Sequence, residues 1–139
     1  MCRRGHRVVQ VAFKKLESRN LKGYVVWLPL LRSDTGASCD AEAEDVHDDN
    51  RISLWWNERK DIGKAFSKTL GLRRTAMDIF LVYGPGKTWT GVAPPKPDFW
   101  MHQLGNRSGA DQTSFLNQGV FEERLWQFVH HRENVTTNN

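Results

Sequence analysis

The sequence contains little cysteine and no long apolar run. Two cysteines in 139 residues cannot form the multi-disulfide framework that stabilises many small secreted proteins. No apolar stretch approaches the ~20 residues that a membrane-spanning helix needs, and no segment has the apolar core of a secretion signal. We therefore expect a cytoplasmic protein that is not inserted in a membrane.

Metal-ligand and phosphate-binding patterns are also missing. The five histidines show no metal-ligand spacing, and the adjacent His130 and His131 would point apart on a helix. His47 lies among acidic residues, where a solvated face is the favoured interpretation. The sequence Gly84-Pro85-Gly86-Lys87 is expected to join two strands, whereas a phosphate loop joins a strand to a helix. We expect no metal and no cofactor.

Aromatic residues are abundant, with six tryptophans and seven phenylalanines. The length and the ordinary apolar fraction predict a single domain over residues 2–131, followed by a polar tail at 132–139. Two interpretations of the aromatic residues stay open, namely packing in the core and the lining of an apolar pocket. The candidate pocket residues are Trp55, Trp56, Trp89, Trp100 and His102.

The net charge of +4 is modest, and basic residues concentrate at the beginning of the chain. An acidic stretch at 40–49 follows them, and opposite charges in one small domain are typical of solvated faces. A nucleic-acid surface would interleave basic residues with exposed aromatic side chains. Because Phe13 falls on the apolar stripe of the first helix, nucleic-acid binding through that helix is the weaker alternative.

Apolar spacing predicts the secondary structure of the first half. It indicates a helix over 5–19 and a strand over 24–31, whose continuous apolar run is typical of burial on both faces. Ser38 is expected to cap a helix over about 39–47. Alternation from Ile52 to Trp56 predicts the next strand.

In the second half, helical spacing over 62–70 ends at Gly71, a favourable helix terminator. A strand over 77–83 and a turn at 84–87 are expected to lead into a second strand at 88–92, forming a hairpin. A stiff connector at 93–97 and an unassigned stretch at 98–114 precede a helix from Phe115 to about His131. The resulting order α-β-α-β-α-β-β-α predicts an α/β fold with a largely parallel sheet.

This order resembles the thioredoxin-like fold superfamily with its first strands removed. Cys2-Arg3-Arg4-Gly5 at the start of a helix is similar to the second half of a thioredoxin-type C-x-x-C site. Residues 52–89 resemble the strand–helix–strand stretch of thioredoxin-like and peroxiredoxin-like proteins. Residues 94–105 are similar to the tail of a group of uncharacterised bacterial thioredoxin-like proteins. The resemblance implies a three-layer sandwich with a central, mostly parallel sheet and a C-terminal hairpin, incomplete at its N-terminus.

The chain departs from the family pattern at two places. The first cysteine of the C-x-x-C pair is absent, and the cis-proline that the family carries would fall near Thr75-Ala76, where neither residue is proline. The resemblance also implies that the missing strand would lie between the strands at 24–31 and 77–83. We therefore expect a gap in the middle of the sheet.

Cys2 and Cys39 are the candidate catalytic residues. The position of Cys2 at a helix N-terminus, beside Arg3 and Arg4, favours the thiolate, and an ordinary terminal thiol is the alternative. The resemblance implies that Cys39 lies at the same sheet edge. A bridge between the two would need their Cα atoms within about 7 Å, and two unrelated thiols are the favoured interpretation.

The favoured function is a binding or assembly module without dithiol oxidoreductase activity. A single-cysteine redox protein that uses Cys2 or Cys39 is the alternative, and it would be a thiol–disulfide oxidoreductase. Strands that lack a neighbour leave backbone groups unpaired at about 1–3 kcal/mol each when buried, and exposed edges invite association. We therefore expect a homodimer that completes the sheet, with another protein partner as a further option.

Overall fold

The computed structural model describes residues 3–38 and 49–130, and it gives no side-chain placement for Arg3, Arg4 and His6. The chain divides into two compact units, Met1–Asp61 and Ile62–Asn139. The structure is a mixed α/β arrangement with one parallel and one antiparallel pair of strands. In the described part of the chain, no helix combines the length and the apolar composition needed to cross a bilayer.

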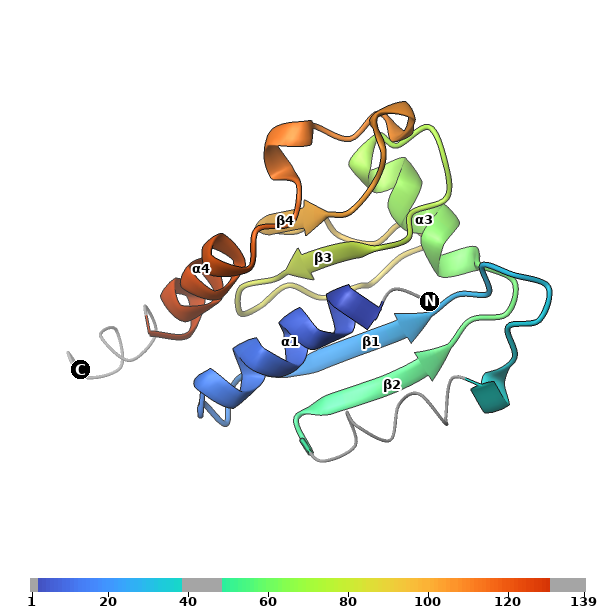
Figure 1. Cartoon of the computed structure of the whole chain (residues 1–139). Coiled ribbons are helices and arrows are strands. Elements are labelled where there is room, and N and C mark those ends of the chain that lie inside the picture. Colours follow the sequence, from blue (N-terminus) through green and yellow to red (C-terminus); the bar gives the residue numbers. More distant parts are fainter. Residues whose placement is uncertain (1–2, 39–48, 131–139) are drawn as a thin grey trace. The chain divides into compact units, whose positions relative to one another are not determined.

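The first unit places one helix beside a parallel pair of strands (Figure 1). Helix α1 spans Arg3–Lys15, strand β1 spans Gly23–Trp27 and strand β2 spans Ile52–Trp56. Strands β1 and β2 pair in parallel, with Gly23 opposite Ile52 and Trp27 opposite Trp56. The helix predicted at 5–19 is therefore shifted towards the N-terminus, and β2 has the predicted bounds.

Helix α1 buries Val8, Ala12 and Phe13 of the apolar stripe that the sequence pattern predicts, and Leu16, directly after the helix, is buried with them. The Phe13 ring occupies the space that a side chain at Gly23 would need, since a Cβ atom there would lie 2.8 Å from Phe13 Cζ. A glycine at the first residue of β1 thus allows the helix to approach the strand closely.

Two expectations for the strand predicted over 24–31 are wrong. The strand predicted over 24–31 ends at Trp27, because Leu30 and Leu31 lie in a turn whose backbone N–H groups donate to the Asp34 carboxylate at 2.7 and 2.9 Å. The strand is also not buried on both faces, since Tyr24 is 71% exposed.

Ser38 is not the helix cap that the sequence predicts. Residues 36–38 are already helical, and the Thr35 side chain precedes them, accepting a hydrogen bond from Ser38 N–H at 3.2 Å. A hydroxyl three residues before the bonded N–H is the usual capping geometry, so Thr35 is the cap. The remainder of the helix expected at 39–47 lies outside the described residues.

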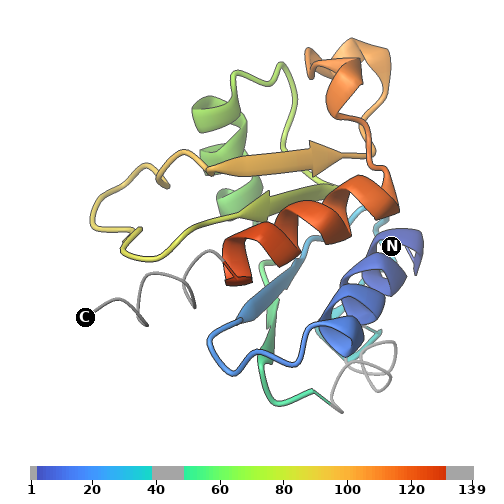
Figure 2. The same cartoon turned by 90° about the vertical axis from the view of Figure 1, so that its left-hand side faces the viewer.

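The second unit contains helix α3 (Asp61–Leu70, whose first residue closes the first unit), strand β3 (Ile79–Val82), strand β4 (Phe99–His102) and helix α4 (Gln118–His130). Two 3-10 helices, η2 (Asn106–Ser108) and η3 (Gln112–Ser114), lie between β4 and α4. Gly71 follows α3 with φ 68°, as the predicted helix end requires. Helices α3 and α4 lie on opposite sides of the β3–β4 pair (Figure 2).

The predicted hairpin partner of β3 is wrong. Strand β3 pairs antiparallel with β4, with Ile79 opposite His102 and Val82 opposite Phe99, and residues 88–92 form no strand. The Asp98 carboxylate accepts the Gly84 N–H at 2.8 Å and lies 3.2 Å from Lys87 Nζ. These contacts join the turn after β3 directly to the residue before β4, so the segment between them forms a loop.

The stretch 98–114, to which the sequence pattern assigns no element, contains strand β4 at its beginning. Phe99–His102 is apolar enough to pair, whereas the glycines and polar residues after it form η2 and η3. Helix α4 begins at Gln118 instead of Phe115, because the Asn117 side chain caps it by accepting Val120 N–H at 3.1 Å. Phe115 instead forms a bridge with His102.

Candidate functional site

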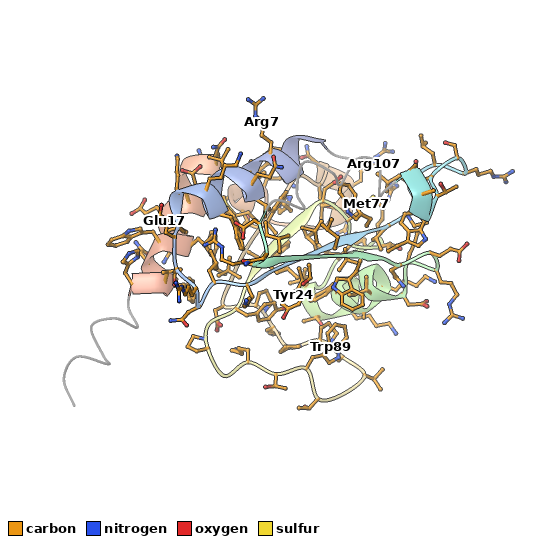
Figure 3. The ribbon with its side chains drawn as sticks, turned by 90° about the horizontal axis from the view of Figure 1, so that it is seen from below. Arg7, Glu17, Tyr24, Met77, Trp89 and Arg107 are labelled. Atoms are coloured by element: carbon orange, nitrogen blue, oxygen red, sulfur yellow. The ribbon has the colours of Figure 1, made fainter. Side chains whose placement is uncertain are left out.

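The face of the β1–β2 pair that α1 does not cover carries exposed aromatic side chains. Side chains alternate along a strand, and the register puts Tyr24 opposite Ser53 and Val26 opposite Trp55. These residues therefore share one face, and we call them the Tyr24–Trp55 face: Tyr24, Val26, Ser53 and Trp55. Figure 3 shows Tyr24 on the far side of the strands from α1 and Arg7.

The Tyr24–Trp55 face is unusually exposed for a parallel pair of strands. The exposed fraction is 59% for Trp55 and 71% for Tyr24. Parallel sheets in proteins are almost always covered on both faces. No charged side chain belongs to this face, so water covers mainly aromatic and aliphatic surface there. Exposed tyrosine and tryptophan in such a setting are typical of contact surfaces.

Arg51 fixes the position of this face relative to α1. Its guanidinium donates to the carbonyls of Phe13 at 2.6 Å and Ser18 at 3.2 Å, and also to the carbonyl of Leu16. The Phe13 carbonyl belongs to the last turn of α1, where helix carbonyls lack partners within the helix and attract positive charge. The carbonyls of Leu16 and Ser18 belong to the residues that follow the helix. Because Arg51 immediately precedes β2, it attaches the helix end to the beginning of that strand.

Asp49 completes this connection by binding the same guanidinium. Its carboxylate accepts from Arg51 Nε at 2.9 Å and from Nη2 at 2.6 Å, a two-point geometry that only arginine provides. The hydrogen bond from Arg51 lowers the pKa of the Asp49 carboxyl below its ordinary value. The sequence analysis missed both residues, because their role depends on a contact between segments about 35 positions apart.

The five candidate pocket residues do not form one cluster within either unit. Trp55 and Trp56 point to opposite faces of β2. The Trp56 ring lies near Gly36, where an added Cβ atom would be 3.7 Å from Trp56 Cδ1. In the second unit, the ring of Trp100 lies 5.5 Å from that of His102. The Trp89 ring instead meets Phe66 of α3 edge-on at 5.8 Å.

His102 is fully buried, and both of its ring nitrogens have partners. Leu104 N–H donates to Nδ1 at 3.0 Å, and Nε2 lies 2.9 Å from the Asp111 carbonyl. Nδ1 must therefore carry a lone pair, so the neutral ring bears its proton on Nε2 and donates it to Asp111. A histidine engaged in this way has a structural role in the pocket region, and it is not free to bind a ligand.

Asp78 is a further residue that the sequence analysis missed. It has φ 49°, a left-handed conformation that is unusual for a residue with a side chain. Burial raises the pKa of its carboxyl above the ordinary value. Its carbonyl accepts Gln103 N–H at 2.9 Å, so this backbone turn sets the point where β3 begins beside β4.

The candidate redox residues Cys2 and Cys39 lie outside the described residues, and so does His47. Among the residues at 3–38 and 49–130, no cluster of histidine, cysteine or carboxylate side chains has the composition of a metal site. Helix α1 exposes Arg7, Lys14 and Lys15, whereas its aromatic residue Phe13 is buried. The basic face of α1 therefore lacks the stacking side chains that single-stranded nucleic acid uses.

Comparison of the chain with protein-family models, with curated proteins and with solved structures gives no match.

Proposed function

We propose that this protein is a thioredoxin-like binding or assembly module without dithiol oxidoreductase activity, and that a second copy of the chain covers its Tyr24–Trp55 face. The observation that carries the proposal is the exposure of Tyr24 and Trp55 on a parallel strand pair whose other face is packed against α1. The order of elements, with a parallel pair followed by an antiparallel pair and a final helix, supports the thioredoxin-like part of the proposal.

The absence of charge on the face favours a second copy as its partner. In a two-fold dimer each residue of the interface meets the same surface of the other copy, so charged groups of one sign would repel. The chain has a net charge of +4, and basic side chains lie on the exposed side of α1. The uncharged Tyr24–Trp55 face is thus a surface of the first unit where two copies can approach without bringing like charges together.

The strand pair also supports association. Among the described strands, β1 and β2 pair only with each other, and α1 packs against one face of the pair. The other face lacks the covering that a parallel sheet usually has. Contact between two copies would remove the aromatic face from water, at roughly 25 cal/mol for each Å² of apolar surface. This gain is the driving force that we assign to the dimer.

Sedimentation velocity at micromolar concentration tests the proposal. We expect the wild-type chain to sediment as a dimer and Trp55→Lys to sediment as a monomer, because each copy would place a charge in the interface. The matched control is Trp126→Lys, which changes an exposed tryptophan on α4 and should leave the dimer intact. A wild-type chain that is monomeric throughout this concentration range would overturn the proposal.

A further inference from the structure

The loop between β3 and β4 presents an uncharged tip to water. Its residues 88–92 have the sequence Thr-Trp-Thr-Gly-Val, and each of them is exposed. The exposed fraction is 44% for Trp89 and 98% for Val92. We call residues 88–92 the Trp89–Val92 tip. Two large apolar side chains are thus left in water close together on one loop of the second unit.

Contacts on both sides of the tip hold this loop in place. At its base, the Asp98 carboxylate binds the turn that follows β3, as described above. On the returning side, the Thr69 hydroxyl donates to the Pro94 carbonyl at 3.2 Å. The Tyr83 hydroxyl donates to the Pro95 carbonyl at 2.9 Å. Because the loop is already ordered, binding through its tip requires little further loss of conformational freedom.

The indole of Trp89 can leave water without losing a hydrogen bond. Its N–H donates to the Gly91 carbonyl at 2.6 Å, within the tip itself. Its ring meets Phe66 of α3 edge-on at 5.8 Å, and the rest of its surface is open to solvent. A donor that already has its acceptor stays paired when the ring enters a less polar medium. Tryptophan is enriched where a membrane meets water.

The charges around the tip are almost all positive. Between residues 62 and 97, a single carboxyl group, that of the half-buried Asp78, accompanies a set of exposed basic residues: Lys64, Lys68, Arg73, Arg74, Lys87 and Lys96. Lys87 and Lys96 flank the tip in the sequence, and Lys68 belongs to the part of α3 that binds the loop. Asp98 lies 3.2 Å from Lys87 Nζ and offsets its charge. Lys68 and Lys96 therefore give this region a positive potential.

We propose that the Trp89–Val92 tip docks on the surface of a bilayer that contains anionic phospholipids. Trp89 and Val92 enter the level of the headgroups, and the lysines around the tip are attracted by the negative lipids. Apolar side chains and basic charge are two signals that peripheral membrane binding combines, and no membrane-spanning segment takes part. Single-stranded nucleic acid fits less well, because it stacks on several aromatic side chains and the tip has only Trp89.

Cosedimentation of the full chain with lipid vesicles tests the proposal. We expect binding to phosphatidylcholine vesicles that contain about 30% phosphatidylserine, and weaker binding when salt is added. The attraction of one lysine to such a surface corresponds to about a fivefold change in binding. Without the attraction of Lys68 and Lys96, binding to pure phosphatidylcholine should be more than about tenfold weaker. Equal binding to the two kinds of vesicle, or binding to neither, would overturn the proposal.

A pair of valine substitutions tests the position of the contact. Val92→Asp should lower binding to the anionic vesicles more than about tenfold, because it places a negative charge at the membrane surface. Its side chain is almost fully exposed, so the fold should be unaffected. Val120→Asp changes an exposed valine of α4 and alters the net charge equally, yet it should bind as the wild type does. Equal losses in the two variants would overturn the proposal.

A pair of lysine substitutions separates the tip from the basic face of α1. Lys96→Gln should lower binding to the anionic vesicles about fivefold, whereas Lys14→Gln, at an exposed position of α1, should change it little. A larger effect at Lys14 would assign the membrane contact to α1 and overturn the proposal. A tip that contacts a second copy instead would leave the vesicles unbound and make Val92→Asp sediment more slowly than the wild type, which would also overturn it.

Discussion

Arg51 holds Phe13 by two different contacts. Its Nη2 donates to the Phe13 carbonyl at 2.6 Å, and its guanidinium carbon lies 5.1 Å from the centre of the Phe13 ring. The first contact satisfies a carbonyl at the end of α1, and the second is a cation–π interaction. Since the same ring packs on Gly23 of β1, Arg51 joins the helix, the first strand and the beginning of the second.

Replacing Arg51 with lysine should therefore destabilise the first unit. Lysine keeps the charge but cannot form the two-point contact with Asp49 and reach the carbonyls at the end of α1 and just after it at the same time. We expect the free energy of unfolding to fall by about 2 kcal/mol, the scale of hydrogen bonds to a charged group. Urea unfolding measures it, and Arg19→Lys at an exposed position is the control, with an expected change below about 0.5 kcal/mol. Equal effects of the two substitutions would contradict the role of Arg51.

Stability should also decrease in acid through Asp49. The hydrogen bond from Arg51 lowers the pKa of this carboxyl in the folded state. A carboxyl of this kind stabilises the fold above its unfolded pKa, near 3.9, and this contribution is lost as the pH falls through the lower, folded value. In thermal unfolding scans from pH 6 to pH 2, Asp49→Asn should show a weaker pH dependence than the wild type. Glu58→Gln, at an exposed position, should retain the wild-type dependence, and identical slopes for all three chains would refute the assignment.

Gly23→Ala should be more harmful than an alanine substitution at a typical surface glycine. The new Cβ would lie 2.8 Å from Phe13 Cζ and 3.3 Å from Ile52 Cγ1, so the helix and the strand must separate. Overpacking of this kind costs about 1–3 kcal/mol. Gly91→Ala is the control, because a Cβ atom there meets nothing within 4 Å. A calorimetric Tm that is lowered equally in both variants would show that the close approach of Phe13 is not required.

The chain should not reduce insulin disulfides in the presence of a reductant. Thiol–disulfide turnover of the thioredoxin type needs an attacking and a resolving thiol, and the sequence Cys2-Arg3-Arg4-Gly5 holds one cysteine where a C-x-x-C site has two. Turnover that disappears in Cys2→Ser would instead support the single-cysteine redox function. In the same samples, mass spectrometry after mild oxidation tests whether Cys2 and Cys39 form a bridge, and adducts on Cys2 alone would speak against their proximity.

Local patterns were sufficient to predict the elements that depend on neighbouring residues. Strand β2 has the predicted bounds, and α3 ends at Gly71 because a left-handed glycine stops a helix wherever it occurs. The sequence did not predict which face of β1 is exposed, because Tyr24 and the two valines after it form an uninterrupted run of largely apolar residues. An apolar run does not reveal which side chain is left in water.

The features that could not be predicted from the sequence depend on contacts between distant segments of the chain. The predicted partner of β3 was the segment 88–92, and the observed partner is Phe99–His102. The difference follows from the hydrogen bond between Asp98 and Gly84, which are 14 positions apart in the sequence. The roles of Arg51 and His102 likewise depend on carbonyls that only the folded chain brings to them. The candidate site was predicted in part, since Trp55 was named and Tyr24 was not.

Photo-cross-linking from position 24 tests the central claim most directly. With p-benzoylphenylalanine in place of Tyr24, irradiation of the full chain at micromolar concentration should yield a covalent homodimer. Its cross-linked peptide should contain residues of the Tyr24–Trp55 face of the second copy. The same photoreactive residue in place of the exposed Trp126 should give no dimer. Cross-links confined to one chain, or no cross-link at all from position 24, would contradict the assignment of this face to a second copy.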